Sequence, residues 1–300
     1  MVAIIVLNYN NPDITKKCIQ SIFDNCTGNY SVFLVDNAST DGSYEKFRIW
    51  YGNSDIKIIH SPENTGYAAG NNIGAREALC AGASHLLFMN NDIILQNDIV
   101  AILLRTLHNS RAVVVGPEIV SPDLKKMVYN RRILDFRSYL LDKKPFVFLH
   151  KYLGVANRHY DVSERMLEFN GMVSGSCFMI DAKIFKQIEG FDEGTFLYGE
   201  EDILAYKLRE IGCICAYQPN AKVVHWHSST ISPQGEAFER YHRYYSALYV
   251  LRKYARVSDC QFIIAALINL APCAVNAICH GDYRLYFRRL FNDYMRLLRC

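Results

Sequence analysis

Short apolar runs alternate with segments of helical periodicity along the first 120 residues. The stretch 2–7 is unbroken and apolar, whereas 14–23 carries apolar side chains at the spacing of an amphipathic helix. This alternation predicts βαβ units and a mainly parallel sheet covered by helices. Ligands of such sheets bind beyond the carboxyl ends of the strands. We expect strands at 2–7, 32–35, 56–59, 86–89 and 113–115, and helices at 14–23, 43–50, 67–82 and 98–107.

The regular pattern stops after residue 120 and resumes near residue 173. The segment 121–169 mixes basic and aromatic residues, which predicts an insertion or a mobile loop region. Helical periodicity from 237 to 256 and two further helical stretches end the chain. We therefore expect an α/β domain over 1–235 and a helical extension over 236–300. The α/β domain should continue with strands at 173–180, 214–217 and 222–225, and helices at 182–188 and 200–211.

Charge is nearly balanced, with 33 Lys and Arg against 30 Asp and Glu and a formal net charge of +3. This balance, and the lack of a basic run in the first half, disfavours a dedicated nucleic-acid-binding protein. The surplus is local, because the segment 283–300 contains five arginines and one aspartate. Positive charge is therefore a property of the C-terminal extension.

The ten cysteines include no C-x-x-C pair, which argues against a structural zinc site. We interpret them as reduced, mostly buried thiols of a cytosolic protein, since a chain of this length and apolar content needs no disulfide framework. The N-terminal apolar run agrees with that interpretation. It has no basic flank and is too short for a signal peptide.

Polar motifs follow three of the predicted strands. Asp36 and Asn37 could bind a base or ribose, although a strand-to-helix turn capped by Asp41 explains them as well. The glycines and asparagines of 64–74 would let a backbone approach an anionic ligand, or simply pack a helix closely. Asn90-Asn91-Asp92 offers oxygen ligands for Mg²⁺ or Mn²⁺, or a capped turn. No G-x-G-x-x-G follows an early strand, which disfavours a dinucleotide-binding fold.

Three consecutive carboxylates, Glu200-Glu201-Asp202, stand at the start of a predicted helix. The helix dipole favours acids there, but three exceed what capping requires. Their mutual repulsion should raise the pKa of at least one of them, which suits a general base. Further along, His225 and His227 fall on one face of a predicted strand and could point at the same ligand. A core histidine is the ordinary alternative.

In this order, the motifs resemble those of the family 2 glycosyltransferases, and most of all the bacterial rhamnosyltransferase-like enzymes that build cell-surface polysaccharides. The resemblance covers about residues 1–230 and rests on spaced motifs that are each weak alone. Its pieces are V-L-N-Y-N at 6–10, V-D-N-A-S-T-D-G-S at 35–43, N-T-G-Y-A-A-G-N-N at 64–72, N-N-D at 90–92, V-S-G-S at 173–176, G-F-D-E at 190–193, the acidic cluster and His225.

The resemblance implies a GT-A fold and inverting transfer of a hexosyl or deoxyhexosyl group from a nucleotide-diphosphate sugar. Residues 1–118 would form the donor half and 119–235 the acceptor half. The acceptor it implies is a lipid-linked saccharide in surface polysaccharide or O-antigen synthesis. The nucleotide-binding residues carried over are Asn8, Tyr9, Asp36, Asn37, Asn64, Gly66, Gly70, Asn71 and Asn90.

The same resemblance assigns the catalytic and metal-binding residues. Glu201 is the first candidate for the base and Asp202 the second. Asp92, helped by His225, would hold a divalent cation, Mn²⁺ or Mg²⁺. The family's D-x-D begins here with Asn90 instead of an acid, which leaves Asp92 as the main carboxylate.

Two other functions fit part of the pattern. A non-catalytic sugar-nucleotide-binding scaffold at the membrane would keep the pocket but would have no use for three clustered carboxylates. A nucleotidyltransferase that makes the activated sugar would need a Gly-rich, basic triphosphate loop near the N-terminus, and none is found. The sequence leaves the nucleotide, the sugar, the acceptor and the oligomeric state open.

The C-terminal extension combines apolar and basic residues. The run 262–279 is nearly long enough to cross a bilayer, but Asn269, Pro272 and Asn276 interrupt it, and about 20 clean residues are needed. The arginines and large apolar residues that follow have the spacing of an interfacial helix on anionic lipid. We therefore predict that the chain from about residue 238 docks on the cytoplasmic face of the membrane without spanning it. A helical pair packed on the α/β domain or across a dimer is the alternative.

Overall fold

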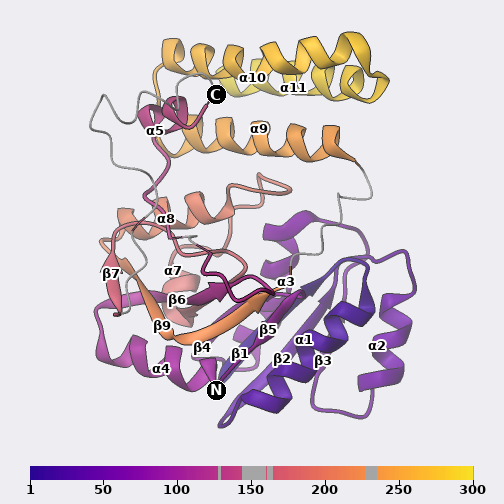
Figure 1. Cartoon of the computed structure of the whole chain (residues 1–300), viewed down its shortest axis with the longest axis vertical. Coiled ribbons are helices and arrows are strands. Elements are labelled where there is room, and N and C mark those ends of the chain that lie inside the picture. Colours follow the sequence, from indigo (N-terminus) through magenta and orange to yellow (C-terminus); the bar gives the residue numbers. More distant parts are fainter. Residues whose placement is uncertain (128–129, 144–159, 161–164, 227–234, 300) are drawn as a thin grey trace.

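The computed structural model describes residues 1–127, 130–143, 160, 165–226 and 235–299. Figure 1 shows an α/β body that carries the amino terminus and, at its far end, a layer of long helices that carries the carboxyl terminus. The predicted α/β class with a C-terminal helical extension is confirmed.

Strands and helices alternate through the first part of the chain, as the apolar pattern predicts. Pro12 stands at the first position of α1, where its missing amide costs no hydrogen bond. Asp98 caps α4, since its side chain accepts from the Ala101 amide at 3.0 Å. The elements are β1 (Val2–Asn8), α1 (Pro12–Asn25), β2 (Tyr30–Asp36), α2 (Ser43–Tyr51), β3 (Lys57–His60), α3 (Gly66–Cys80), β4 (His85–Asn90), β5 (Ile93–Leu95) and α4 (Ile99–Asn109).

The second part completes the sheet and adds the helical layer. The elements from residue 112 to the last strand are β6 (Ala112–Val120), α5 (Phe136–Leu141), β7 (Leu167–Phe169), β8 (Cys177–Asp181), α7 (Ala182–Gln187), α8 (Glu200–Glu210) and β9 (Ile214–His225). The C-terminal helices are α9 (Glu236–Lys253), α10 (Asp259–Cys279) and α11 (Gly281–Arg299).

One nine-stranded sheet runs through the α/β body in the order β3-β2-β1-β4-β8-β6-β9-β5, with β7 also paired to β9. The first four strands of this order are mutually parallel. β8 is antiparallel to both of its neighbours, and β6 and β9 pair in parallel beyond it. The carboxyl ends of β1 to β4 therefore meet at one edge, while β8 and β9 bring the second half of the chain against that edge.

The two faces of the sheet bury separate cores. Along β1, Val2, Ile4 and Val6 face the core that includes α1 and α4, whereas Ala3 and Ile5 face the core that includes α3, α7 and α8. This alternation follows from the two-residue period of a strand. A continuous apolar run such as 2–7 is thus explained by burial on both faces.

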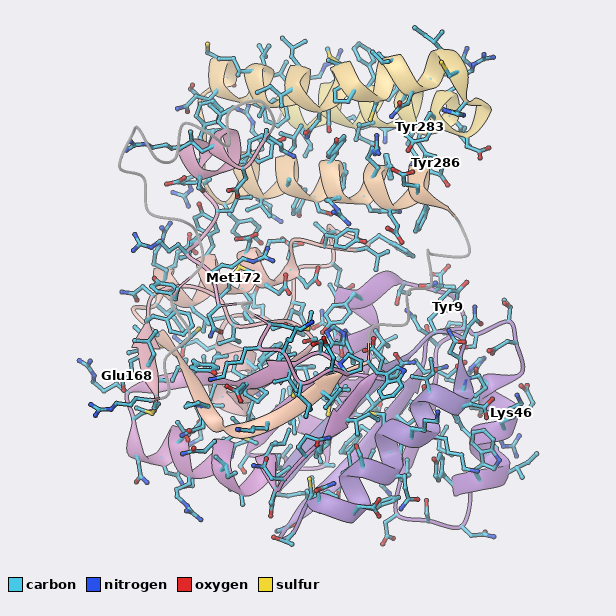
Figure 2. The ribbon with its side chains drawn as sticks, in the orientation of Figure 1. Tyr9, Lys46, Glu168, Met172, Tyr283 and Tyr286 are labelled. Atoms are coloured by element: carbon cyan, nitrogen blue, oxygen red, sulfur yellow. The ribbon has the colours of Figure 1, made fainter. Side chains whose placement is uncertain are left out.

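A third core joins the helical layer to the α/β body. Phe262 of α10, Leu290 of α11 and Leu248 of α9 pack together with Tyr206 of α8. Tyr286 lies between α11 and α9, with its ring 5.6 Å from that of Tyr241 (Figure 2). The extension is therefore packed on the side of the body that carries α8.

Some elements differ from the sequence expectation. β5, β7 and α5 were not expected, because each has six residues or fewer and carries little periodicity. The two strands expected at 214–217 and 222–225 form one strand, β9, across Pro219. The pairing with β6 shifts its register between Pro117 and Glu118, which accommodates residues 219–221 of β9 without partners on β6. α10 is one helix through Asn269 and Pro272, within one of the two expected helical stretches, and by length and composition alone it could cross a membrane.

The described cysteines are all free thiols, as predicted. Five of these nine are buried, at positions 18, 26, 177, 215 and 273. Burial raises the pKa of the Cys26 thiol to about 12, so this side chain packs as a small apolar group.

Candidate active site

The carboxyl ends of the parallel strands form one row of polar residues. The register pairs Asn8 with Asp36, and Asp36 with His60. On the other side of β1, Leu7 pairs with Asn90. The polar loops that follow these strands therefore meet at a single edge of the sheet, which is where α/β proteins bind ligands.

Asn8 and Asp36 are fully buried and hold this edge together. Asn8 Nδ2 donates to Asp36 Oδ1 at 3.0 Å and to Ser39 Oγ at 2.9 Å. Asp36 Oδ2 accepts from the Ser39 amide at 3.2 Å, and Asn8 Oδ1 accepts from the Thr15 hydroxyl at 2.6 Å. These bonds fix the loops after β1 and β2. Asn8 and Asp36, both predicted to bind the nucleotide, are thus buried and outside the lining of the cavity described next, although their chain neighbours Tyr9 and Asn37 line it.

A cavity of about 240 Å³, here the first pocket, opens in front of this edge. Asn37 Nδ2 donates to Asn64 Oδ1 at 3.0 Å and to the Gly66 carbonyl at 3.1 Å, which joins the loop after β2 to the start of α3. Five of the predicted nucleotide-binding residues line it. Its lining is Leu7, Tyr9, Asn37, Asn64, Gly66, Tyr67, Asn90, Asn91, Phe196, Leu197 and Phe238.

Gly66 lets the start of α3 approach the loop that precedes α8. Its φ is +82°, and a Cβ there would lie 2.3 Å from the Phe196 carbonyl oxygen. The Tyr67 amide donates to the same carbonyl at 2.8 Å. A glycine is required at this position because both the backbone conformation and the close approach exclude a side chain.

Two of the predicted nucleotide-binding residues have structural contacts on α3. A Cβ at Gly70 would lie 2.7 Å from a methyl group of Leu7, so this glycine lets the helix pack closely on β1. Asn71 is buried, and its Nδ2 donates to the Tyr67 carbonyl at 3.0 Å. Both residues lie behind the first pocket and outside its lining.

A larger cavity of about 680 Å³, the second pocket, adjoins the first and shares Tyr67, Asn90 and Leu197 with it. It lies between the sheet edge, α8, α9 and α5. Its remaining lining is Arg131, Leu134, Tyr139, Asp142, Lys143, Met172, Ser174, Gly175, Ser176, Tyr198, Gly199, Glu200, Glu201, Asp202, His225, Arg243, Ala247 and Val250.

The acidic cluster at the start of α8 lines the second pocket. Glu201 Oε1 accepts from the Gly175 amide at 2.9 Å, and Asp202 Oδ1 accepts from the Leu134 amide at 3.0 Å. Each of these two carboxylates is therefore held by a backbone amide from a different segment. Both candidates for the base lie at the same wall of one pocket.

Glu200 has the perturbed titration that the sequence predicted for the cluster. Burial, followed by the charge of Glu201, raises the pKa of Glu200 from its ordinary value to about 8. Its Oε2 atom is buried and accepts no hydrogen bond. Sequence reasoning named its two neighbours instead, because the order of residues along a helix does not show which carboxylate turns inward.

Asp92 and His225 lie side by side, with Asp92 Oδ1 3.3 Å from His225 Nε2. β5 brings them together, since Ile93 pairs with His225. Asp92 Oδ1 is buried and accepts no hydrogen bond from the residues that the structure describes. An orphaned carboxylate oxygen beside an imidazole nitrogen fits a divalent cation. Within the described ranges no group of three His, Cys, Asp or Glu forms a larger metal site, and His227 lies outside those ranges.

Comparison with known sequences identifies relatives of this arrangement. The model of the Glycosyl transferase family 2 matches residues 3–188. The low-salt glycan biosynthesis hexosyltransferase Agl10 of Haloferax volcanii is 28% identical over 210 residues, which are 69% of this chain and 61% of that protein. The N-acetylglucosaminyl-diphospho-decaprenol L-rhamnosyltransferase of Mycobacterium tuberculosis is 27% identical over 212 residues, which are 65% and 66% of the two chains. The chain thus spans less than two thirds of the length of either relative.

Solved structures share the fold at low sequence identity. GalNAc-T7, crystallised with UDP, GalNAc and Mn²⁺, superposes with a TM-score of 0.61 and 15% identity over 83% of this chain and 47% of its own. The mannosyltransferase PcManGT of Pyrobaculum calidifontis, in complex with GDP-Man and Mn²⁺, gives a TM-score of 0.55 and 15% identity over 99% and 85%. The expected GT-A architecture is thereby shown. The row of polar strand ends, the acidic cluster on α8 and the match over residues 3–188 together place this chain in glycosyl transferase family 2.

Proposed function

We propose that this protein is an inverting glycosyltransferase that moves a sugar from a nucleotide-diphosphate donor to a saccharide acceptor. The adjacency of the two pockets carries the proposal. Because Tyr67, Asn90 and Leu197 line both, a donor in the first pocket would present its sugar to an acceptor in the second. The acidic cluster lines the second pocket, where an acceptor hydroxyl has to lose its proton.

The composition of the first pocket suits a nucleoside. Asn37 and Asn64 provide amide groups that can pair with polar edges of a base or ribose, while Tyr9 and Phe238 provide aromatic surface. The solved structures that share the fold hold UDP in one case and GDP-Man in another. We therefore propose the first pocket as the site of the donor nucleotide.

Glu201 is proposed as the base, with Asp202 as the second candidate. The Gly175 amide holds one oxygen of Glu201, which orients the carboxylate within the pocket. Burial and the charge of Glu201 raise the pKa of Glu200, which favours the neutral form of Glu200 beside Glu201. Glu201 would accept the proton of the acceptor hydroxyl while that oxygen attacks the anomeric carbon from the face opposite the departing diphosphate. This attack inverts the anomeric configuration.

Asp92 and His225 are the residues that would hold a divalent cation, Mn²⁺ or Mg²⁺. Mg²⁺ in particular is often held by one or two protein carboxylates together with substrate phosphates, which suits a site with a single carboxylate and one imidazole. When bound, such a cation neutralises negative charge on the leaving diphosphate.

The acceptor is proposed to be a lipid-linked saccharide, and the helical layer to rest on the cytoplasmic face of a membrane. One relative is named for transfer to a diphospho-decaprenol. The outer surface of α10 and α11 exposes large apolar side chains, among them Leu267, Ile278 and Leu285, and the arginines of α11 are exposed beside them. Apolar side chains next to arginines are the composition of an interfacial helix.

The decisive experiment measures turnover of a nucleotide sugar. Purified protein would be screened by thermal shift against UDP-, dTDP- and GDP-sugars with Mn²⁺, and hydrolysis or transfer would then be followed with the donor that binds. Glu201→Gln should lower turnover by about 10²–10⁴ while donor binding persists. Glu210→Gln, at the exposed end of the same helix, is the matched control.

Two outcomes oppose the proposal. Near-normal turnover in Glu201→Gln and in Asp202→Asn, made singly, would remove the assignment of the base. Donor binding without any hydrolysis or transfer would instead favour the non-catalytic scaffold.

A further inference from the structure

Three basic side chains gather in the second pocket from separate parts of the chain. Arg131 follows β6, Lys143 follows α5, and Arg243 lies on α9. Within the described residues none of the three forms a salt bridge, even though the acidic cluster lines the same pocket. The three cations thus line the pocket without a salt bridge to Asp142 or to the acidic cluster, although these carboxylates line the same pocket.

Arg131 is held in place by its backbone, not by its side chain. Its amide donates to the Met172 carbonyl at 3.0 Å and its carbonyl accepts from the Met172 amide at 2.9 Å, at a level between the sheet and the helical layer (Figure 2). The Nε atom of Arg131 is buried and has no hydrogen-bond partner in the described part of the chain. A buried guanidinium N–H without an acceptor costs free energy, which a bound anion would recover.

Lys143 and Arg243 are held by aromatic rings. Lys143 Nζ lies 4.7 Å from the ring centre of Tyr139 and 4.9 Å from that of Tyr244. Arg243 Cζ lies 5.0 Å from the ring centre of Tyr198. Burial lowers the pKa of Lys143, and the positive charge of Arg243 lowers it further, whereas the charge of Asp142 raises it. Lys143 and Arg243 are therefore close enough to repel each other. An anion between them would relieve that repulsion.

We infer that Arg131, Lys143 and Arg243 bind the phosphate or diphosphate of the acceptor, so that this enzyme takes a saccharide whose reducing end is phosphorylated. The inference rests on the proposed function and adds the chemical class of its acceptor. Among the described residues no Arg or Lys lines the first pocket, and Asp92 with His225 would serve the donor diphosphate. The cations are therefore left for a second anion, which enters with the acceptor.

The test measures binding of geranyl diphosphate by calorimetry. The nucleoside diphosphate that gives the largest thermal shift is present at saturation with Mn²⁺, so that the donor site is filled. Geranyl diphosphate should bind and geraniol should not. Arg243→Gln, at an exposed position, should weaken binding about tenfold, as should Lys143→Gln and Arg131→Gln. Lys143→Arg should keep binding within about threefold because it keeps the charge.

Arg137→Gln, at an exposed position of α5, is the matched control and should bind as the wild type does. Three results would overturn the inference. In the first, the wild type does not bind geranyl diphosphate; in the second, all three glutamine variants bind it as tightly as the wild type does; in the third, the variants lose nucleoside diphosphate affinity in parallel. If the glutamine variants lose binding to anionic vesicles but keep their affinity for geranyl diphosphate, the cations bind lipid headgroups, and the inference is overturned as well. The proposed function fails separately, by the absence of any nucleotide sugar that binds and turns over.

Discussion

The amide of Gly175 donates to Glu201 Oε1 at 2.9 Å, while its carbonyl accepts from the Tyr67 hydroxyl at 2.6 Å. One residue thus connects the start of α3, beside the first pocket, to the acidic cluster of the second. The proposed base takes its orientation from this connection, and its consequences are measurable.

Gly175→Ala should displace the Glu201 carboxylate. A Cβ at this position would lie 2.8 Å from both Cγ and Oε1 of Glu201, so that side chain has to move. Displacement of a catalytic group by about 1 Å can cost on the order of 10²-fold in rate. We expect kcat to fall by about that factor with little change in donor affinity. Gly212→Ala, where the space is open although φ, unlike that of Gly175, is positive, should leave kcat unchanged. A full-rate Gly175→Ala enzyme would contradict this role.

Glu200→Gln should alter how stability depends on pH. The pKa of Glu200 is raised to about 8 in the folded protein, chiefly by burial, so the folded state binds this proton more tightly than the unfolded state does. Stability of the wild type therefore falls as pH rises from about 4.5 to about 8. Relative to wild type, the unfolding free energy of the variant should be about 3 kcal/mol more favourable at pH 8.5 than at pH 5.5, because the linkage amounts to about 1.4 kcal/mol per pH unit over most of this range. Urea unfolding measures this, and an equal difference at both pH values would count against it.

Asp192→Asn should weaken the attachment of α9 to the loop before α8. Asp192 accepts from the Gly194 amide at 2.7 Å, from Lys253 Nζ at 2.8 Å, and from the hydroxyl groups of Tyr249 and Tyr254. We expect a loss of about 1–3 kcal/mol of unfolding free energy at pH 7. Asp123→Asn, an exposed acid, should have almost no effect.

The same residue makes a prediction at acid pH. Burial raises the pKa of Asp192, but the hydrogen bonds and charge of Lys253 and the other donors outweigh it and lower the pKa to about 2. Because the pKa of Asp192 is lower in the folded than in the unfolded state, the ionised carboxylate stabilises the fold fully above about pH 4, and this stabilisation is lost as pH falls toward 2. The stability gap between wild type and Asp192→Asn should narrow in that window, and a constant gap would show that the charge is not involved.

Asn269→Leu should destabilise the helical layer despite placing an apolar residue in an apolar helix. Asn269 Oδ1 accepts from the Tyr139 hydroxyl at 2.7 Å, and its Nδ2 donates to the Tyr294 hydroxyl at 3.3 Å, all buried. Two unpaired hydroxyl groups should cost about 2–4 kcal/mol. Adding Tyr139→Phe should recover part of the loss. Asn276→Leu on the same helix is the control and should cost little.

The exposed surface of the helical layer should bind anionic lipid. We expect the full chain to float with anionic vesicles at moderate salt, and the triple variant Leu267→Gln, Ile278→Gln and Leu285→Gln to remain in solution, because these side chains are exposed and carry the apolar contact. Substitution is preferable to truncation near Ser258, since α10 and α11 share a core with α9. Ile49→Gln, at an exposed position of α2, is the control variant and should float with the anionic vesicles. If the wild type also stays in solution, the layer is only a packing element.

Much of the candidate site could be predicted from the sequence, because it depends on the pattern of apolar and polar residues along short segments. Buried parallel strands require continuous apolar runs, so the run 2–7 and its successors predict strands whose polar ends must meet at one edge. That topology brings Asn37, Asn64 and Asn90 to one pocket, as the sequence indicated. The role of each residue in binding a nucleotide stays a prediction.

The sequence alone determined the α/β class, the order of the motifs and the position of the acidic cluster, since each follows from the spacing of neighbouring residues. Only the tertiary structure decided that Glu200 carries the raised pKa and that Phe238 of the C-terminal extension lines the first pocket. It also decided that Asn269 of α10 is hydrogen-bonded to Tyr139 of α5. The physical reason is the same in each case. Burial and hydrogen-bond partners are supplied by residues far apart in the chain, 130 positions apart for Tyr139 and Asn269, and no local pattern records which distant group arrives.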